Sequence, residues 1–340
     1  MENKVIAFTA VKELEIMDHS IPELGPNDVL VHVKATALCT QEQRFYSGGK
    51  EVKNYPAVGG HESSGEVVAV GKKVRNCAVG DKVACIGGVL PAMGRKRFEG
   101  EQSKNPDSDG FYKILQGTLS KYVVRNEEDV VVCNQAKNYK DIALAEPVAC
   151  VLSSINKADI KIGDTVLVMG CGIMGLLHIQ LAKMKGAYVI ATEIDPERTG
   201  KALEMGADVV INPKEVDAIE EVKKITEKEG AQVVINTTPL PANYEDAFKM
   251  VARRGKIICY SSQHPDEPIP VSMGMIHSTQ IQLIGTLAST PQENFTAAKL
   301  LAKGMIKTEG LFDQTFPFEE AKAAFERAIV PGTYRVIIED

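Results

Sequence analysis

The feature that most constrains the fold is a glycine-rich turn between an apolar strand pattern and an apolar helix pattern. Residues 166–169 are apolar, the segment Gly170-Cys171-Gly172-Ile173-Met174-Gly175 follows, and residues 176–182 continue with helical spacing. In this context the first glycine permits a tight turn, the second lets the backbone approach a phosphate, and the third lets helix and strand pack closely. The helix N-terminus also favours an anion. The order of strand, turn and helix therefore predicts a dinucleotide-binding unit.

Strand and helix patterns alternate regularly around this turn. The expected strands are residues 165–169, 188–192, 209–211, 233–236, 256–260 and 281–284, with helices such as 175–185 and 196–204 between them. Apolar strands that alternate with helices form a parallel sheet covered on both faces. We therefore expect an α/β domain with the Rossmann fold, a doubly wound parallel sheet.

The first part of the chain has the period of strands instead. Apolar and polar residues alternate over 29–35, and residues 66–70, 82–86 and 121–124 are similar, which predicts a small antiparallel barrel or sandwich. Prolines, glycines and aspartates crowd residues 87–117, which indicates a surface loop. After Thr290 we expect an amphipathic helix, a second helix at 319–328 and a last strand at 334–338.

The composition limits the class of protein. Of the 340 residues, 44% are hydrophobic and 25% charged, as in globular proteins long enough for two domains. A net charge of -6 disfavours a broad surface for nucleic acid or anionic membrane. The seven cysteines show no disulfide spacing, and neither a signal peptide nor a membrane span is apparent. We expect a cytoplasmic protein with a small-molecule partner and no nucleic-acid or membrane partner.

An acidic residue, Glu193, ends the second strand of the α/β part. A carboxylate about twenty residues after the glycine turn accepts hydrogen bonds from the adenosine ribose and repels the 2′-phosphate of NADP. We therefore predict NAD as the cofactor, with Arg198 keeping NADP as the alternative. The expected cofactor residues are Gly170, Gly172, Ile173, Met174, Gly175, Glu193, Arg198 and Thr237.

Four residues outside the α/β part offer metal-ligand chemistry. Cys39 stands alone, His61 and Glu62 follow Gly60, and Glu146 precedes a proline. Thiolate, imidazole and carboxylate are the ligand types of Zn²⁺, and a catalytic zinc needs three protein ligands with one position open. Each residue alone has an ordinary explanation, such as a buried thiol or a helix cap. The prediction of a zinc site rests on the four together.

In the order of its motifs the chain resembles the zinc-dependent medium-chain dehydrogenases, in particular the polyol, sorbitol and threonine dehydrogenase branch. The resemblance spans nearly the whole chain and rests on Gly60-His61-Glu62, the segment GEVVAVG at 65–71, Gly80-Asp81-Lys82-Val83, Glu146-Pro147 and the Gly163-Asp164 step before the glycine turn. It implies a GroES-like β-rich catalytic domain at 1–150, a Rossmann NAD-binding domain at 151–286, and a return to the catalytic domain at 287–340. A homodimer or homotetramer is also implied, with an edge strand such as 281–284 pairing between subunits.

The resemblance carries the family's zinc ligands to Cys39, His61 and Glu146, with Glu62 either a ligand or a neighbour of the ligands. It places Arg335 at the cofactor pyrophosphate, with a solvated strand charge as the alternative. One catalytic zinc is implied. A structural zinc is not expected, because residues 87–117 lack the four cysteines that hold one in many members.

The sequence departs from the family pattern just after Cys39. Where the family has glycine, serine or threonine, aspartate and then histidine, this chain has Thr40, Gln41, Glu42 and Arg44. The hydroxyl and imidazole that pass the alcohol proton to solvent are missing, and Thr40, Glu42 or ordered water are the candidate replacements. Arginine does not deprotonate near neutral pH but binds carboxylate or phosphate in a fork. Arg44 is therefore either a contact to an anionic substrate or a partner of the cofactor phosphates or of Glu42.

Together these features predict an NAD- and zinc-dependent oxidoreductase that interconverts a secondary alcohol and a ketone. The substrate classes are a polyol, sugar, sugar phosphate or hydroxy acid. Zinc would polarise the hydroxyl as a Lewis acid, and the nicotinamide would take the hydride. Two alternatives are a metal-free NAD(P)H reductase of the same fold and a catalytically silent nucleotide-binding protein. The altered residues after Cys39 are the only support for the silent protein.

Overall fold

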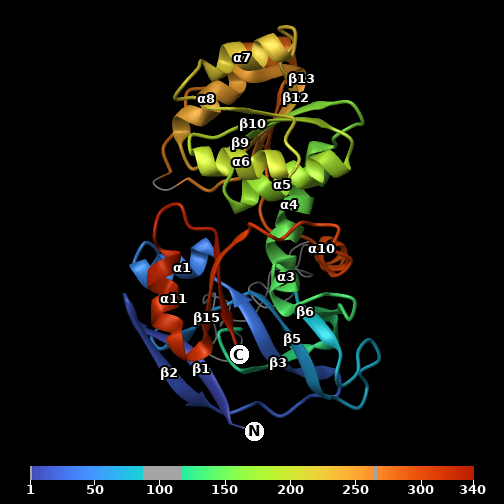
Figure 1. Cartoon of the computed structure of the whole chain (residues 1–340), viewed down its shortest axis with the longest axis vertical. Helices are drawn as coiled ribbons and strands as arrows, with labels where there is room; N and C mark the ends of the chain where they lie inside the picture. The colour runs from blue at the N-terminus through green and yellow to red at the C-terminus, as the bar shows by residue number, and fades with distance from the viewer. Residues whose placement is uncertain (1, 87–116, 264–265) are drawn as a thin grey trace. The chain divides into compact units, whose positions relative to one another are not determined.

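The computed structural model describes residues 2–86, 117–263 and 266–340 (Figure 1). The chain forms two compact units: residues 1–149 together with 290–340, and residues 150–289. The chain therefore leaves the first unit, builds the second, and returns to complete the first. The surface loop expected at 87–117 lies outside the described residues, except for its last residue, Gly117.

The second unit is built on a six-stranded sheet with the order β11-β10-β9-β12-β13-β14. Every adjacent pair in it is parallel. The order reverses between β9 and β12, and a ligand crevice forms at the carboxyl ends of the strands at such a point. The strands are β9 (Thr165–Met169), β10 (Tyr188–Thr192), β11 (Val209–Ile211), β12 (Ala231–Asn236), β13 (Val251–Cys259) and β14 (Gln282–Gly285). The predicted doubly wound parallel sheet is confirmed.

Helices alternate with these strands and begin at clear sequence signals. The side chain of Asp195 accepts hydrogen bonds from the N–H groups of Glu197 and Arg198, and Pro196 opens the helix behind it, as is typical of helix N-termini. The helices are α4 (Ala145–Ala158), α5 (Ile173–Met184), α6 (Pro196–Glu204), α7 (Ala218–Ile225), α8 (Pro241–Met250) and α9 (Met273–Thr279). The two predicted helices are confirmed, although the first begins two residues early because Gly172 is its N-cap.

The described residues of the first unit form two sheets. A seven-stranded sheet has the order β15-β16-β3-β5-β6-β8, with β7 also paired to β3, and a three-stranded sheet has the order β2-β1-β4. All pairs are antiparallel except β15 with β16. The strands are β1 (Asn3–Ala10), β2 (Glu13–His19), β3 (Asp28–Ala37), β4 (Ala57–Val58), β5 (Glu62–Val70), β6 (Lys82–Cys85), β7 (Tyr122–Asn126), β8 (Val130–Val132), β15 (Phe312–Pro317) and β16 (Arg335–Glu339). The predicted β-rich part is confirmed, and β5 begins four residues earlier than expected.

Three neighbouring strands of the larger sheet position the candidate site. In the register of this sheet, Ala37 at the end of β3 lies opposite Glu62 on β5 and opposite Ile337 on β16. Cys39 follows β3 by two residues, and Arg335 begins β16. The sheet therefore brings together chain segments from its beginning, its middle and the C-terminal return.

Among its described residues, the first unit has the helices α1 (Thr40–Ser47), α3 (Tyr139–Ala143), α10 (Pro291–Ala302) and α11 (Ala321–Ala328). Helix α1 was not predicted. It buries Glu42, Phe45 and Tyr46, which have the i, i+3, i+4 spacing of one helix face, and it ends at Gly48 with a φ of 78°. Among the described helices, none is long and apolar enough to cross a membrane.

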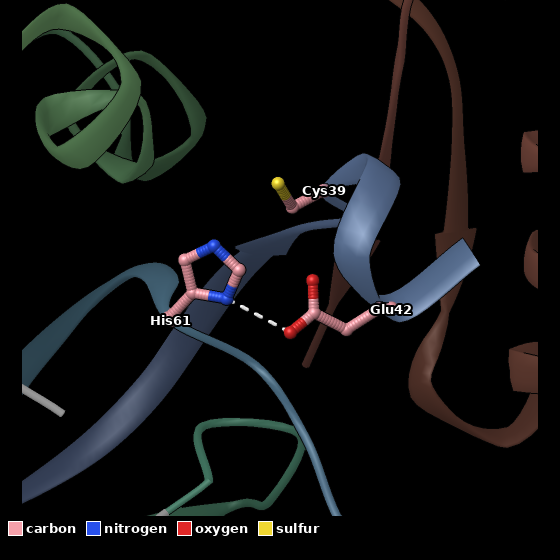
Figure 2. A group of neighbouring side chains, drawn as sticks. All are labelled: Cys39, Glu42 and His61. Carbon is pink, nitrogen blue, oxygen red and sulfur yellow. Dashed lines mark hydrogen bonds and ion pairs between the residues drawn. The ribbon is translucent and has the colours of Figure 1, made fainter. Parts of the chain in front are cut away.

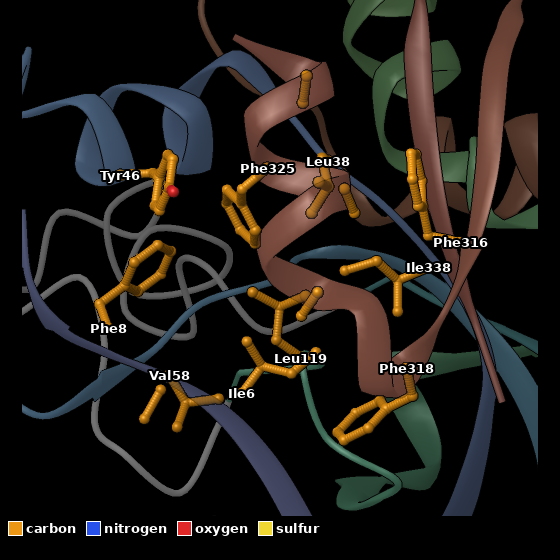
Figure 3. Packing of buried hydrophobic residues seen from close by; sticks show 14 of the residues in the cluster. Ile6, Phe8, Leu38, Tyr46, Val58, Leu119, Phe316, Phe318, Phe325 and Ile338 are labelled. Carbon is orange, nitrogen blue, oxygen red and sulfur yellow. The ribbon is translucent and has the colours of Figure 1, made fainter. Parts of the chain in front are cut away.

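A buried aromatic cluster holds α1 in place (Figure 3). The ring of Phe325 on α11 packs edge-on against Phe8 of β1, with centroids 5.4 Å apart, and lies 5.2 Å from the ring of Tyr46 on α1. Full burial of one such side chain contributes about 1.5–3 kcal/mol. Helix α1, and with it Glu42, is therefore fixed by the C-terminal return of the chain.

Candidate metal centre and cofactor turn

Cys39, Glu42 and His61 converge at the start of α1 (Figure 2). A sulfur, a carboxylate oxygen and a ring nitrogen from these residues lie within 4.8 Å of one another. Cys39 is the residue before α1, Glu42 lies in the first turn of that helix, and His61 immediately precedes β5. The three groups come from two segments that the sheet and the aromatic cluster hold in place.

Glu42 fixes the orientation of the His61 ring. The Nδ1 atom of His61 lies 2.8 Å from Oε1 of Glu42, and the Gly60 N–H donates to the same oxygen at 3.2 Å. Because an ionised carboxylate only accepts, Nδ1 is the donor. Burial acts to lower the pKa of His61, but the charges of Glu42 and Cys39 outweigh it and raise the pKa well above its usual value. A metal at Nε2 would therefore displace the proton from that nitrogen. Figure 2 shows this second nitrogen on the side of Cys39. Metal-binding histidines characteristically donate their other N–H to a carboxylate in this way.

The Glu42 carboxylate is fully buried yet remains ionised. Burial acts to raise the pKa of Glu42, but the charge and hydrogen bond of His61 and the Gly60 N–H outweigh it, so the pKa is lowered from its usual value. A buried carboxylate requires such partners. Glu42 was one candidate for carrying the alcohol proton. Because its carboxylate hydrogen-bonds to His61, Glu42 is better suited to orienting the His61 ring than to carrying the proton.

A second group of ligand atoms shares His61. Atoms from His61, Glu62 and Glu146 also lie within 4.8 Å of one another. Glu62 is fully buried at the start of β5, and Glu146 is partly exposed in the first turn of α4. Cys39 and Glu146 therefore each lie close to His61, but in separate groups of ligand atoms that share only this histidine.

These donors fit a zinc ion. They offer one thiol, one imidazole and two carboxylates, the ligand types that Zn²⁺ accepts. Bonds of about 2.0–2.3 Å place tetrahedral ligands roughly 3.5 Å apart. Each of the two groups is within 4.8 Å, and side-chain rotations would draw Cys39 and Glu146 together around one ion. Burial, followed by the charge of Glu62, raises the pKa of the Cys39 thiol. Zinc binding is therefore coupled to loss of that proton.

Arg335 lies beside two of the candidate metal ligands, Cys39 and Glu62. Its guanidinium donates to both oxygens of Glu62, at 2.8 and 2.6 Å, and its Nη2 lies 3.7 Å from Sγ of Cys39. Only 5% of the residue is exposed. A buried carboxylate needs a charged partner in the interior, and Arg335 supplies it. Arg335 therefore neutralises Glu62 beside the candidate metal ligands, and its contact with the cofactor pyrophosphate stays a prediction.

In the second unit, the glycine turn has the geometry that its sequence indicates. Gly170 follows β9 with a φ of 91°, and a Cβ on Gly175 would lie 1.9 Å from the carbonyl oxygen of Gly170. A side chain is therefore excluded at Gly175 and strained at Gly170. A Cβ on Gly172 would meet no atom within 4 Å. This open side, at the N-terminus of α5 where Ile173 and Met174 begin the helix, suits an anion.

Glu193 and Thr237 lie on either side of this turn. Oε2 of Glu193 accepts from the Cys171 N–H at 2.7 Å, and Oε1 accepts from the N–H groups of Ile194 and Asp195. The hydroxyl of Thr237 donates to the Met169 carbonyl at 2.8 Å. Arg198 lies in the first turn of α6. The backbone therefore holds a carboxylate against the turn at the end of β10.

The remaining predicted site residues lie on α1. Thr40 is exposed at the first position of the helix, and Nη2 of Arg44 donates to the Gly49 carbonyl at 3.2 Å. Sequence reasoning missed Lys50, whose Nζ donates to the side-chain oxygen of Gln41 at 3.2 Å. No sequence motif marks this lysine, because its position depends on how the loop after α1 folds back.

Comparison with known proteins covers both units. Residues 25–135 match the family model of the alcohol dehydrogenase GroES-like domain, and residues 174–303 match that of the zinc-binding dehydrogenase. A sorbitol dehydrogenase of Bacillus subtilis is 30% identical over 96% of this chain and 93% of its own length. A D-arabitol-phosphate dehydrogenase of Enterococcus avium is 28% identical over 96% and 94%. Galactitol-1-phosphate dehydrogenase from Escherichia coli has a similar structure, with a TM-score of 0.84 and 26% identity over 99% of this chain and 100% of its own.

Proposed function

The chain belongs to the zinc-dependent medium-chain dehydrogenase family, and we propose that it interconverts a polyol or sugar, or one of their phosphates, with the corresponding ketone, using one zinc and NAD. The observation that carries this proposal is the convergence of Cys39, His61, Glu62 and Glu146, with Glu42 orienting the histidine. The substrate class follows from the similar proteins, which by name act on sorbitol, D-arabitol phosphate and galactitol 1-phosphate.

In this proposal Cys39, His61 and Glu146 hold the metal, and Glu62 stands beside them. Bound zinc supplies Lewis-acid polarisation of the substrate hydroxyl, and the nicotinamide accepts the hydride. Glu42 keeps the His61 ring in the tautomer that presents Nε2. Because Glu42 is committed to His61, Thr40 or ordered water is left to pass the alcohol proton to solvent. A metal-free reductase or a silent protein is not favoured, because neither needs this set of ligands and its support.

An absorbance assay of the nicotinamide tests the proposed function. The purified chain is expected to reduce NAD with at least one member of a panel of polyols, sugars, polyol phosphates and hydroxy acids. Prolonged incubation with a chelator should abolish the activity, and added zinc should restore it, because the ligands lie in one open site. Turnover that survives complete removal of zinc would support the metal-free reductase instead. No turnover with any substrate, from protein that holds zinc, would support the silent protein.

We propose NAD over NADP because of Glu193. Its carboxylate is held by the Cys171, Ile194 and Asp195 N–H groups at the end of β10, where it would accept from the ribose hydroxyls and repel a 2′-phosphate. Glu193→Ser should lower the ratio of kcat/KM for NAD to that for NADP by about 10- to 100-fold. Glu197→Ser, on the exposed start of α6, is the matched control and should leave the ratio unchanged. Higher kcat/KM with NADP than with NAD in the unmodified protein would overturn the assignment.

We also propose a homo-oligomer, located in the cytoplasm. Strand β14 is an edge of the parallel sheet, and Leu283 on it is 45% exposed, with Leu287 just beyond it 79% exposed. An exposed edge with apolar side chains is a template for pairing with a second copy. The seven free cysteines fit a reducing compartment. Light scattering of the purified chain should give a mass of two or four chains, and a monomer would contradict the proposal.

A further inference from the structure

We propose that the substrate is a phosphate monoester and that Lys50 and Arg44 bind its phosphate beside the metal centre. The inference rests on the proposed alcohol dehydrogenase function and narrows its substrate class. The supporting observation is that the loop after α1 folds back and places the side chain of Lys50 at the start of that helix.

Lys50 is folded back along α1 toward Cys39. Its backbone N–H donates to the Arg44 carbonyl at 3.1 Å, and its Nζ donates to the side-chain oxygen of Gln41 at 3.2 Å. Gln41 is the second residue of α1 and follows Cys39 by two positions. The Nζ atom also lies 5.3 Å from the ring centroid of Phe45. The aromatic face and the amide thus hold the ammonium group on the helix end that carries the metal ligand.

Arg44 places a second positive charge near this ammonium group. Of its five guanidinium N–H donors, one is used in the bond to Gly49. Within the described ranges, no carboxylate pairs with Arg44. Burial, followed by the charge of Arg44, lowers the pKa of Lys50, against the opposite effects of Glu42 and Cys39. Like charges held close to each other repel, and an anion bound between Arg44 and Lys50 would reduce that repulsion.

The formal charges around the metal centre also favour an anion. Glu42, Glu62 and Glu146, with Cys39 as thiolate, carry four negative charges. A bound Zn²⁺ and the side chains of Arg335, Lys50 and Arg44 carry five positive charges. With zinc bound, these groups sum to one net positive charge, which would attract an anionic substrate more strongly than a neutral one.

The two cations match a phosphate better than a carboxylate. A phosphate monoester carries between one and two negative charges near pH 7 and has three acceptor oxygens. Arginine binds such a group in a bidentate fork, and lysine binds it as a point charge. A carboxylate offers a single charge and two acceptor oxygens, so it matches two neighbouring cations less well. We therefore choose the phosphate, and a hydroxy acid is the alternative anion to be tested.

Calorimetric titration of the zinc-loaded full chain tests the subsite without turnover. Sorbitol 6-phosphate and inorganic phosphate are expected to bind, with sorbitol and gluconate binding at least about 10-fold more weakly than the phosphate ester. Lys50→Met and Arg44→Gln should each weaken binding of sorbitol 6-phosphate about 10- to 100-fold, the range for a lost hydrogen bond to a charged group. Lys53→Gln is the matched control. It removes one exposed positive charge three residues further on and should change the affinity by less than about 3-fold.

Steady-state kinetics on the same variants provides the second readout. Lys50→Met and Arg44→Gln should raise KM for the phosphate ester far more than KM for the neutral polyol or for NAD. Equal losses on both substrates, a rise confined to KM for NAD, or tighter binding of gluconate than of the phosphate ester would overturn the phosphate subsite. Phosphate binding that both variants abolish, in a protein without dehydrogenase activity, would support the subsite and reject the proposed function.

Discussion

His61→Ala is expected to lower kcat/KM by at least about 1,000-fold and to reduce the zinc content far below one ion per chain. His61 is the residue shared by both groups of ligand atoms, so its removal takes the central donor out of the site. Lewis-acid polarisation is worth several kcal/mol, and each 1.36 kcal/mol corresponds to a factor of ten in rate. The fold should remain, because alanine removes a polar side chain that hydrogen-bonds to Glu42 and leaves the apolar cluster around α1 intact.

Elemental analysis and activity should be measured on the same samples, with circular dichroism to verify folding. The control is His277→Ala, an exposed histidine on α9, which should retain both zinc and activity. Glu42→Gln should show an intermediate effect, with zinc affinity about 10- to 100-fold weaker, as for other partners of metal-binding histidines. A His61→Ala protein that keeps one zinc and nearly normal turnover would contradict the metal site. Two tightly held zincs in the unmodified chain would contradict the single site.

The second unit was predictable from the sequence because its signals are local. The glycine turn, the alternating strands and Glu193 at a strand end all lie within short segments whose order specifies the topology. Strand β13 was the least accurate, since it begins at Val251, five residues before the expected start. The polar Arg253 and Arg254 conceal this beginning, although both lie in the strand.

The metal centre could be predicted only as a set of ligand types. Its supporting contacts join distant segments: Glu42 binds a histidine 19 positions away, and Arg335 binds a carboxylate 273 positions away. The spacing of apolar residues along the sequence does not indicate such pairs, because they depend on the register of β16, β3 and β5. The family pattern placed Arg335 at the cofactor, which stays a prediction. The structure adds a contact that the pattern did not indicate, the ion pair of Arg335 with the buried Glu62.

Arg335→Met is expected to lower the melting temperature of the zinc-free protein by roughly 10 °C. The substitution leaves Glu62 fully buried without its bidentate partner. Breaking a buried ion pair by removing one member lowers the free energy of unfolding by about 3–5 kcal/mol. For a unit of this size, each kcal/mol lowers the melting temperature by about 2–4 °C. The control is Lys4→Met, which removes a pair whose side chains are 43% and 83% exposed. Such surface pairs contribute about 0–1 kcal/mol.

A second variant tests whether the lower melting temperature comes from the unpaired charge of Glu62 or from disrupted packing. Glu62→Met combined with Arg335→Met removes both charges from the interior, and replacing a buried ion pair by apolar side chains is often neutral or stabilising. This double variant should therefore melt at a higher temperature than Arg335→Met alone. Zinc should offset part of the loss in Arg335→Met, because an unpaired Glu62 carboxylate lies within the group of ligand atoms around His61 and would turn to the metal. A double variant that melts no higher than Arg335→Met would show that Arg335 acts through packing. If Arg335→Met lowered the melting temperature equally with and without zinc, Glu62 would not be a zinc ligand.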